Sequence, residues 1–277
     1  MKKIYFIAMF TLLLVACNRK ETLSDKSVLK NKVTAQTELD TYIYNNFQKP
    51  YNIIVTYNWK DSDFEFNKFL YPPTKSKIKP MLEVVKKVWI DSYSEIAGAN
   101  FIKEVAPRQI SLVGGYNVNE NGTITLGFAD SGMKIALFGV DKIDLSDRDR
   151  VREYFHTVHH EYCHIINQKK PYSDEFAKIT PSGYTAVWNN HTDAEALELG
   201  FISAYARANN IEDFAEMTAH MLIMGKTAWD TKINAITSAT GKEALRKKEA
   251  FVVNYFKSEW NIDFYELQAE VQRKIQQ

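Results

Sequence analysis

Apolar residues recur at spacings of three and four over residues 75–96, which predicts a helix with one buried face. Shorter apolar runs follow it, separated by turn-forming residues, and predict strands. The Asn121-Gly122 pair and the Asp130-Ser131-Gly132 run predict turns between these strands. Before residue 146 the expected elements are helices over 37–47 and 75–96 and strands over 52–59, 109–116, 123–128 and 133–140.

From residue 146 the periodicity is helical almost to the end of the chain. Ser146 is expected to cap a helix that runs to about Gln168, because hydroxyl side chains satisfy free backbone N–H groups at helix starts. Strands followed by helices predict an α+β fold. Its expected parts are an N-terminal α/β part over 37–145 and a helical, zinc-binding part over 146–277.

The N-terminal residues have the pattern of a targeting signal rather than that of a folded domain. Lys2 and Lys3 precede an apolar run that is too short for the roughly 20 residues of a membrane-spanning helix. The run ends Leu14-Val15-Ala16-Cys17, which resembles the lipobox of bacterial lipoproteins. That resemblance implies a signal peptide over 1–16, lipidation of Cys17 and a polar tether over 17–36. A plain secretory signal and a single-pass anchor are the alternatives.

Composition narrows the classes of function mainly by exclusion. The 277 residues include 35 Lys and Arg against 34 Asp and Glu, and the net charge of +1 offers no electrostatic basis for binding nucleic acid. Two cysteines rule out a disulfide framework.

The chemistry concentrates in His160-Glu161-Tyr162-Cys163-His164, an HExxH motif inside the expected helix. Two imidazoles four residues apart share one helix face and can bind one zinc ion at about 2.0–2.1 Å. Glu161 is expected to act as general base toward a zinc-activated water rather than as a ligand. The competing interpretation is an amphipathic helix whose polar face happens to carry His and Glu.

Three further residues, two before the motif and one inside it, have expectations of their own. His156 is expected to lie beside the site without binding the metal, because no glutamate follows it. His159 points away from the ligand face, which predicts a surface position or one that supports a ligand. Cys163 is expected to be a small buried packing residue.

A third zinc ligand must come from later in the chain. Asn167 and Lys170 stand at the positions where HExxHxxGxxH requires Gly and His, so that variant is excluded. The run from Ile211 to His220 is the candidate, with Asn210 as its expected helix cap. Its residues Glu212 and Glu216 share a face, so one can bind the metal and the other can orient a ligating histidine.

With these motifs the chain resembles the glutamate-zincin metallopeptidases. The runs Gly200–Ala206 and Glu212–Glu216 are most similar to zinc-metallohydrolase lipoproteins that accompany outer-membrane nutrient importers in gut-type bacteria. The resemblance implies a zincin-like fold, Glu212 as third ligand and Glu216 as its support. It also implies that Tyr205, seven residues before Glu212, points at the substrate. Cys163 departs from the family, in which many members have glycine.

The expected protein is therefore a lipid-anchored zinc hydrolase of the cell envelope, in the outer membrane, that cleaves peptides or glycoproteins. The strand over 133–140 is expected to edge its cleft. The alternative is a metal-containing accessory protein without catalysis that binds peptide or glycan for an importer, on an aromatic platform of Tyr184, Trp188 and Tyr205. Glu161 favours the enzyme, since a site that only binds has no use for a base.

Overall fold

The structure is a computed structural model that describes residues 37–58, 68–120, 122–130 and 132–277. The expected signal peptide and tether, with Cys17, lie outside these residues, and their assignment stays a prediction. Residues 38–277 belong to one compact unit. Within the described residues, no helix combines the length and hydrophobicity that a bilayer-spanning segment requires.

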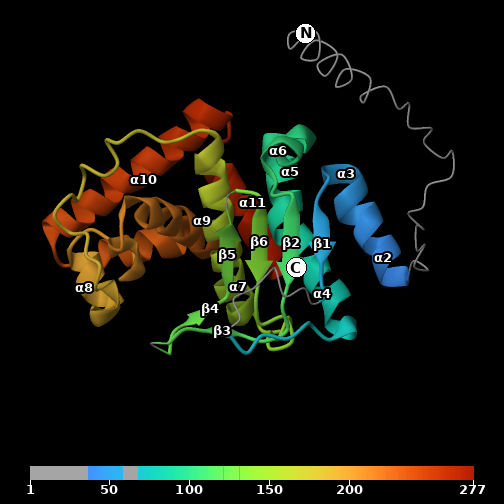
Figure 1. Ribbon diagram of the computed structural model, residues 1–277. Coiled ribbons are helices and arrows are strands. Elements are labelled where there is room, and N and C mark those ends of the chain that lie inside the picture. Colours follow the sequence, from blue (N-terminus) through green and yellow to red (C-terminus); the bar gives the residue numbers. More distant parts are fainter. Residues whose placement is uncertain (1–36, 59–67, 121, 131) are drawn as a thin grey trace, which may run out of the picture. The chain divides into compact units, whose positions relative to one another are not determined.

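A four-stranded mixed sheet runs through the N-terminal half in the order β1-β2-β6-β5 (Figure 1). The first three of these strands are parallel, and β5 pairs antiparallel to β6. The expectation that residues 133–140 form the sheet edge is wrong, because β6 lies between β2 and β5 and the edge strands are β1 and β5. The bounds are β1 (Ile54–Thr56), β2 (Gln109–Leu112), β5 (Gly127–Asp130) and β6 (Lys134–Leu137).

Two short strands, β3 (Asn117–Val118) and β4 (Ile124–Thr125), form a separate hairpin. Its turn contains Gly122, whose φ of 81° is a left-handed conformation that glycine adopts without strain. The expected turn is therefore found at Gly122, with Asn121 outside the described residues, although it joins β3 to β4 rather than two strands of the main sheet.

The N-terminal helices include the two that the sequence predicts and one that it does not, over residues 99–105. The helix expected over 75–96 is continuous from residue 75 to residue 97, with a π-helical stretch at its centre, and it buries Met81 and Trp89 completely. The segments are α2 (Glu38–Ile43), η1 (Tyr44–Gln48), α3 (Lys49–Tyr51), α4 (Lys75–Val85), η3 (Lys86–Asp91), α5 (Ser92–Ala97) and α6 (Ala99–Val105).

The C-terminal half is mainly helical, which confirms the α+β prediction. Helix α7 (Arg148–Lys169) packs against β5 and β6 and against α9, so the apolar face that includes Phe155 and Tyr162 is buried (Figure 1). The remaining elements are η4 (Trp188–Asn190), α8 (Asp193–Glu198), η5 (Tyr205–Arg207), α9 (Asn210–Asn234), α10 (Ala239–Trp260) and α11 (Phe264–Gln276).

Both predicted helix caps are displaced by one residue. The carboxylate of Asp147, not the hydroxyl of Ser146, accepts hydrogen bonds from the first N–H groups of α7; the Ser146 hydroxyl instead donates to Asp144. Asn209, not Asn210, caps α9 by accepting from the backbone N–H groups of residues 211 and 212. In each case the capping residue has an extended backbone, as the cap position requires.

Helix α9 breaks at Gly225, where φ is 75°. The break frees backbone carbonyls in the turn before it, and a buried carbonyl without a donor is costly. Two glutamines of α11 supply the donors: Gln268 to the carbonyl of Met221 and Gln272 to those of Leu222 and Ile223. The packing of α11 against α9 thus stabilises the kink in the helix that carries the candidate ligands.

Candidate metal centre

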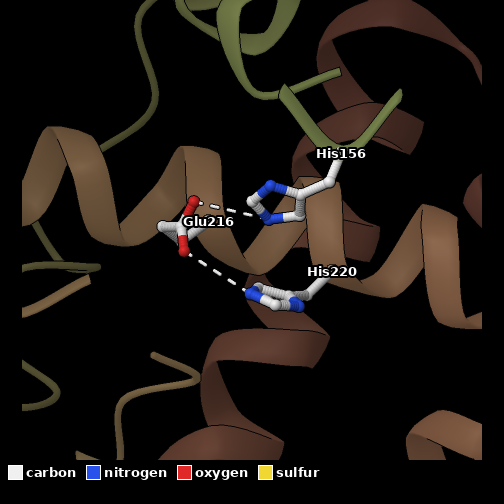
Figure 2. Close-up of side chains that lie close together, drawn as sticks. All are labelled: His156, Glu216 and His220. Carbon is white, nitrogen blue, oxygen red and sulfur yellow. Dashed lines mark ion pairs between the residues drawn. The ribbon is translucent and has the colours of Figure 1, made fainter. Parts of the chain in front are cut away.

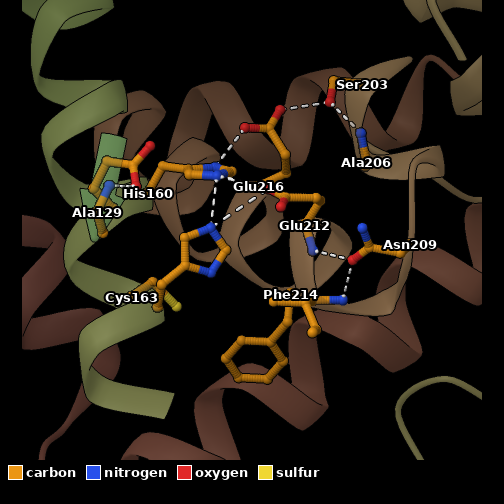
Figure 3. A network of polar contacts seen from close by, with 12 residues as sticks. Ala129, His160, Cys163, Ser203, Ala206, Asn209, Glu212, Phe214 and Glu216 are labelled. Carbon is orange, nitrogen blue, oxygen red and sulfur yellow. Dashed lines mark hydrogen bonds and ion pairs between the residues drawn. The ribbon is translucent and has the colours of Figure 1, made fainter. Parts of the chain in front are cut away.

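Helices α7 and α9 pack side by side and bring the HExxH motif against Glu212. The Nε2 atom of His160 lies 3.0 Å from Oε2 of Glu212 and 3.1 Å from Nε2 of His164. Nε2 of His164 lies 3.4 Å from the same Glu212 oxygen. Three ligand atoms from two helices therefore converge on one point (Figure 3).

The triangle fits a zinc ion. Ligands at about 2.0–2.1 Å in tetrahedral geometry stand about 3.3 Å apart, and the three observed separations run from 3.0 to 3.4 Å. Two imidazole nitrogens this close repel each other unless a proton or a cation lies between them. The donor set of two histidines and one glutamate is that of catalytic zinc sites with one open position.

The charges of the site suit a cation. Burial alone would lower the pKa of His160, but hydrogen bonds to Glu212 and Glu216 raise it to about 10. Burial opposes ionisation of Glu212 as well, yet the imidazoles of His160 and His164 hold its pKa well below the ordinary value. A metal ion would take the place of the proton that His160 otherwise holds.

Glu216 lies behind the ligand His160 rather than among the ligands. Its Oε1 accepts from Nδ1 of His160 at 2.8 Å, and its Oε2 accepts from the Ser203 hydroxyl at 2.5 Å. Ser203 in turn accepts from the backbone N–H of Ala206 at 3.1 Å. The carboxylate is almost completely buried, so this chain of hydrogen bonds fixes its position (Figure 3).

Glu161 faces the edge strand of the sheet. Its Oε2 accepts from the backbone N–H of Ala129 in β5 at 2.6 Å. Burial raises its pKa, against the opposing effect of His160 and His164. With His160, Glu161 lines a cavity of about 430 Å³. The carboxylate thus stands beside the candidate metal ligands and at the wall of a space that can hold a substrate.

Tyr205 lines the same cavity, in the short turn η5 before α9, as its turn-rich surroundings predicted. Its ring centroid lies 5.8 Å from that of His160 and 4.8 Å from that of Trp188. Burial, with the charge and a hydrogen bond of Glu212, raises its pKa. The hydroxyl therefore stays protonated at neutral pH and can donate a hydrogen bond.

The aromatic platform of Tyr184, Trp188 and Tyr205 does not form. Trp188 and Tyr205 pack edge to face, but the Tyr184 hydroxyl donates to Asp213 at 2.9 Å and its ring packs on Phe201. Tyr184 therefore contacts the buried residues Asp213 and Phe201 rather than joining Trp188 and Tyr205 in a sugar-binding surface.

The expectation for His159 is wrong as well. The side chain is fully buried, with its ring centroid 5.9 Å from that of Tyr93 and 6.5 Å from that of Phe155. Burial lowers its pKa to about 3, so the ring is neutral. Cys163 is also fully buried, as expected of a packing residue, and burial raises the pKa of its thiol to about 12.

Sequence reasoning missed two residues that contact Glu216. Ser203 carries no recognisable signal in the sequence. His220 does, because it stands four residues after Glu216 on α9, as His156 stands four residues before His160 on α7. Together His156, Glu216 and His220 form a second group able to hold a metal ion (Figure 2).

Comparisons with known proteins agree with this geometry. The profile of a family described as "Putative zinc-binding metallo-peptidase" matches residues 32–265. Among solved structures, the chain is similar to a "putative zinc-binding metallo-peptidase" from Bacteroides caccae, with 34% sequence identity and a TM-score of 0.72 over 85% of this chain and 90% of that chain. No curated protein matches the chain. Because the profile spans most of the sequence and the solved structure shares its fold, the chain belongs to this family of zinc-binding metallopeptidases.

Proposed function

We propose that this chain is a zinc-dependent peptidase of the glutamate-zincin type, with His160, His164 and Glu212 as the zinc ligands. The observation that carries the proposal is the convergence of their three ligand atoms, 3.0–3.4 Å apart, beside the carboxylate of Glu161. When bound, zinc would polarise the scissile carbonyl and make a water molecule acidic enough to attack it.

Glu161 is the general base in this proposal. It takes a proton from the attacking water and later delivers that proton to the leaving amine. The hydrogen bond from Ala129 holds one of its oxygens and leaves the other to receive the proton. Because Ala129 belongs to β5, this hydrogen bond also links the edge strand of the sheet to α7, the helix that carries Glu161.

Glu216 is a positioning residue. Its hydrogen bond with Nδ1 of His160 directs the opposite nitrogen of that ring toward the ligand triangle. The Ser203 hydroxyl holds the other oxygen of the carboxylate, so Glu216 cannot turn away.

Tyr205 is the hydrogen-bond donor for the oxyanion that forms when the carbonyl is attacked. A phenol suits this role because it donates without adding a charge to the resting site. Support comes from its place on the cavity wall and its proximity to Glu212.

Localisation is part of the proposal and rests on the sequence. A lipidated Cys17 would anchor the peptidase in the cell envelope, in the outer membrane, where it would act on peptides handled by a nutrient importer. Mass spectrometry of the membrane fraction should find a lipid-modified peptide that begins at Cys17. An uncleaved segment 1–16 would contradict the anchor.

The central experiment compares zinc content and peptide hydrolysis in the wild type and in Glu161→Gln. The variant should keep its zinc and lose about 10²–10⁴-fold in turnover, the usual contribution of a positioned general base. Glu83→Gln is the control, since this exposed carboxylate pairs only weakly with Lys79 on α4; its turnover should match the wild type. His164→Ala should lose the zinc held with His160 and Glu212.

Two outcomes would contradict the proposal. Zinc loss in Glu161→Gln would make Glu161 a ligand, and unchanged turnover in that variant with zinc bound would remove it from the chemistry.

A further inference from the structure

We propose that His156, Glu216 and His220 form a second binding site for a divalent cation of the zinc class. Nε2 of His156 lies 3.4 Å from Oε1 of Glu216, and Nε2 of His220 lies 3.4 Å from Oε2 of the same carboxylate. One ligand atom of each residue lies within 4.8 Å of the others. Figure 2 shows the two imidazoles reaching the two oxygens of Glu216 from α7 and α9.

The separations suit a shared cation better than hydrogen bonds. An N–H···O hydrogen bond spans about 2.7–3.2 Å, whereas both imidazole–carboxylate distances here are 3.4 Å. They match the roughly 3.3 Å between ligands of a tetrahedral zinc ion. Moreover, Nε2 of His156 is buried and has no hydrogen-bond partner among the described residues. A cation between the three groups would satisfy it.

Glu216 can serve both sites. Oε1 already accepts from His160 and Oε2 from Ser203, but each carboxylate oxygen has a second lone pair. His156 lies 3.4 Å from Oε1 and His220 lies 3.4 Å from Oε2, so each imidazole has one of these oxygens within reach. The carboxylate charge is therefore available to a second ion while it still orients His160.

The second site has its own access to solvent. His156 and His220 line a cavity of about 410 Å³, together with Ile124 and Ile223. The cavity of about 430 Å³ beside His160 is lined by His156 and Glu216 but not by His220. An ion can therefore reach the second site without passing the first. Both histidines are partly exposed, at 23% and 24% of the side-chain surface, so little rearrangement is needed.

The donor set predicts the type of ion, and the shared Glu216 predicts that the two sites fill one after the other. Two imidazoles and one carboxylate favour zinc and similar transition metals over calcium or magnesium, which prefer oxygen ligands. A cation on Glu216 weakens that carboxylate as acceptor for His160, so each ion lowers the affinity for the other. We expect the His160 site to fill first.

The test is a titration of metal-free protein with Co²⁺, followed by visible absorption and checked by zinc content after dialysis. The wild type should bind two ions per chain in two phases, and His220→Ala one ion, with only the first phase. His164→Ala should lose the first phase and keep the second. His191→Ala is the matched control, because this half-exposed histidine pairs with Glu195 away from both sites and should keep both phases.

A single ion in the wild type, or two ions in a folded His220→Ala, would overturn the proposal. His220→Gln provides a second variant if the alanine variant does not fold, with circular dichroism as the check, and it should also bind one ion. The outcome is separable from the proposed peptidase function, because a wild type that binds two ions but cleaves no peptide contradicts only that function.

Discussion

Glu216 holds His160 by the ring nitrogen that faces away from the ligand triangle, with Oε1 2.8 Å from Nδ1. Glu212, one helical turn earlier, stands 3.0 Å from the other nitrogen of the same ring. The two carboxylates therefore act on opposite sides of one imidazole. Their spacing of four residues along α9 produces this arrangement, because both lie on the helix face toward α7.

The two glutamates should differ in their effect on zinc. Glu212→Ala removes a ligand and should lower the affinity of the first site far more than Glu216→Ala, whose loss should cost about 10–100-fold. Competition with a chelator at less than one zinc per chain measures this affinity without filling the second site. The reverse order would identify Glu216 as the ligand and Glu212 as its support.

The helices of the site could be predicted because their signals are local. The periodicity of α7 and the spacings within residues 160–164 and 212–216 place the ligands on helix faces before any tertiary contact is known. The caps were missed by one residue because several capping side chains stand together, such as Asn209 and Asn210, and only the backbone conformation selects one.

Features that depend on distant contacts could not be predicted in the same way. The position of β6 inside the sheet follows from its pairing with β2, which stands more than twenty residues earlier in the sequence. The one local signal for it is the unbroken buried run Ile135–Leu137, which is typical of a central strand. His159 is buried because Tyr93 of α5 packs over it, and nothing near His159 in the sequence indicates that contact.

Tyr205→Phe should separate hydrogen bonding from packing. The variant keeps the ring that contacts Trp188, so fold and zinc content should be unchanged. Loss of one oxyanion donor should lower kcat by about 10²–10³-fold with little change in KM. Tyr44→Phe serves as control, since this tyrosine is exposed at 44% on η1. Equal kcat in wild type and Tyr205→Phe would leave Tyr205 with a packing role alone.

Cys163→Ala should affect stability and not the metal. Cys163 lies inside the HExxH motif, but it is fully buried and belongs to neither group of candidate ligands. Removing its sulfur leaves a small void and should lower the free energy of unfolding by about 1 kcal/mol. Urea unfolding and zinc content measure the two effects separately. A fall in zinc content in the folded variant would show that the thiol takes part in metal binding.

Acid should weaken the ion pairs that Glu270 makes within α11. Both of its oxygens accept from the guanidinium of Arg273, at 2.8 and 2.6 Å, and Lys274 lies 3.4 Å away. The hydrogen bonds from Arg273 come first among the causes that lower its pKa from 4.5 to about 2. Because the pKa is lower in the folded state, the contribution to stability is complete above pH 4.5 and is lost as the pH falls through about 2.

Glu270→Gln should therefore lower the free energy of unfolding at pH 7 by about 0.5–1 kcal/mol, since a partly exposed ion pair contributes no more. The difference from the wild type should shrink between pH 4.5 and about 2. Urea unfolding of the metal-free protein measures it without interference from zinc release. In an Arg273→Gln background the same substitution should cost less, because its main partner is gone. A difference that stays constant across this pH range would mean that the charge of Glu270 contributes nothing to stability.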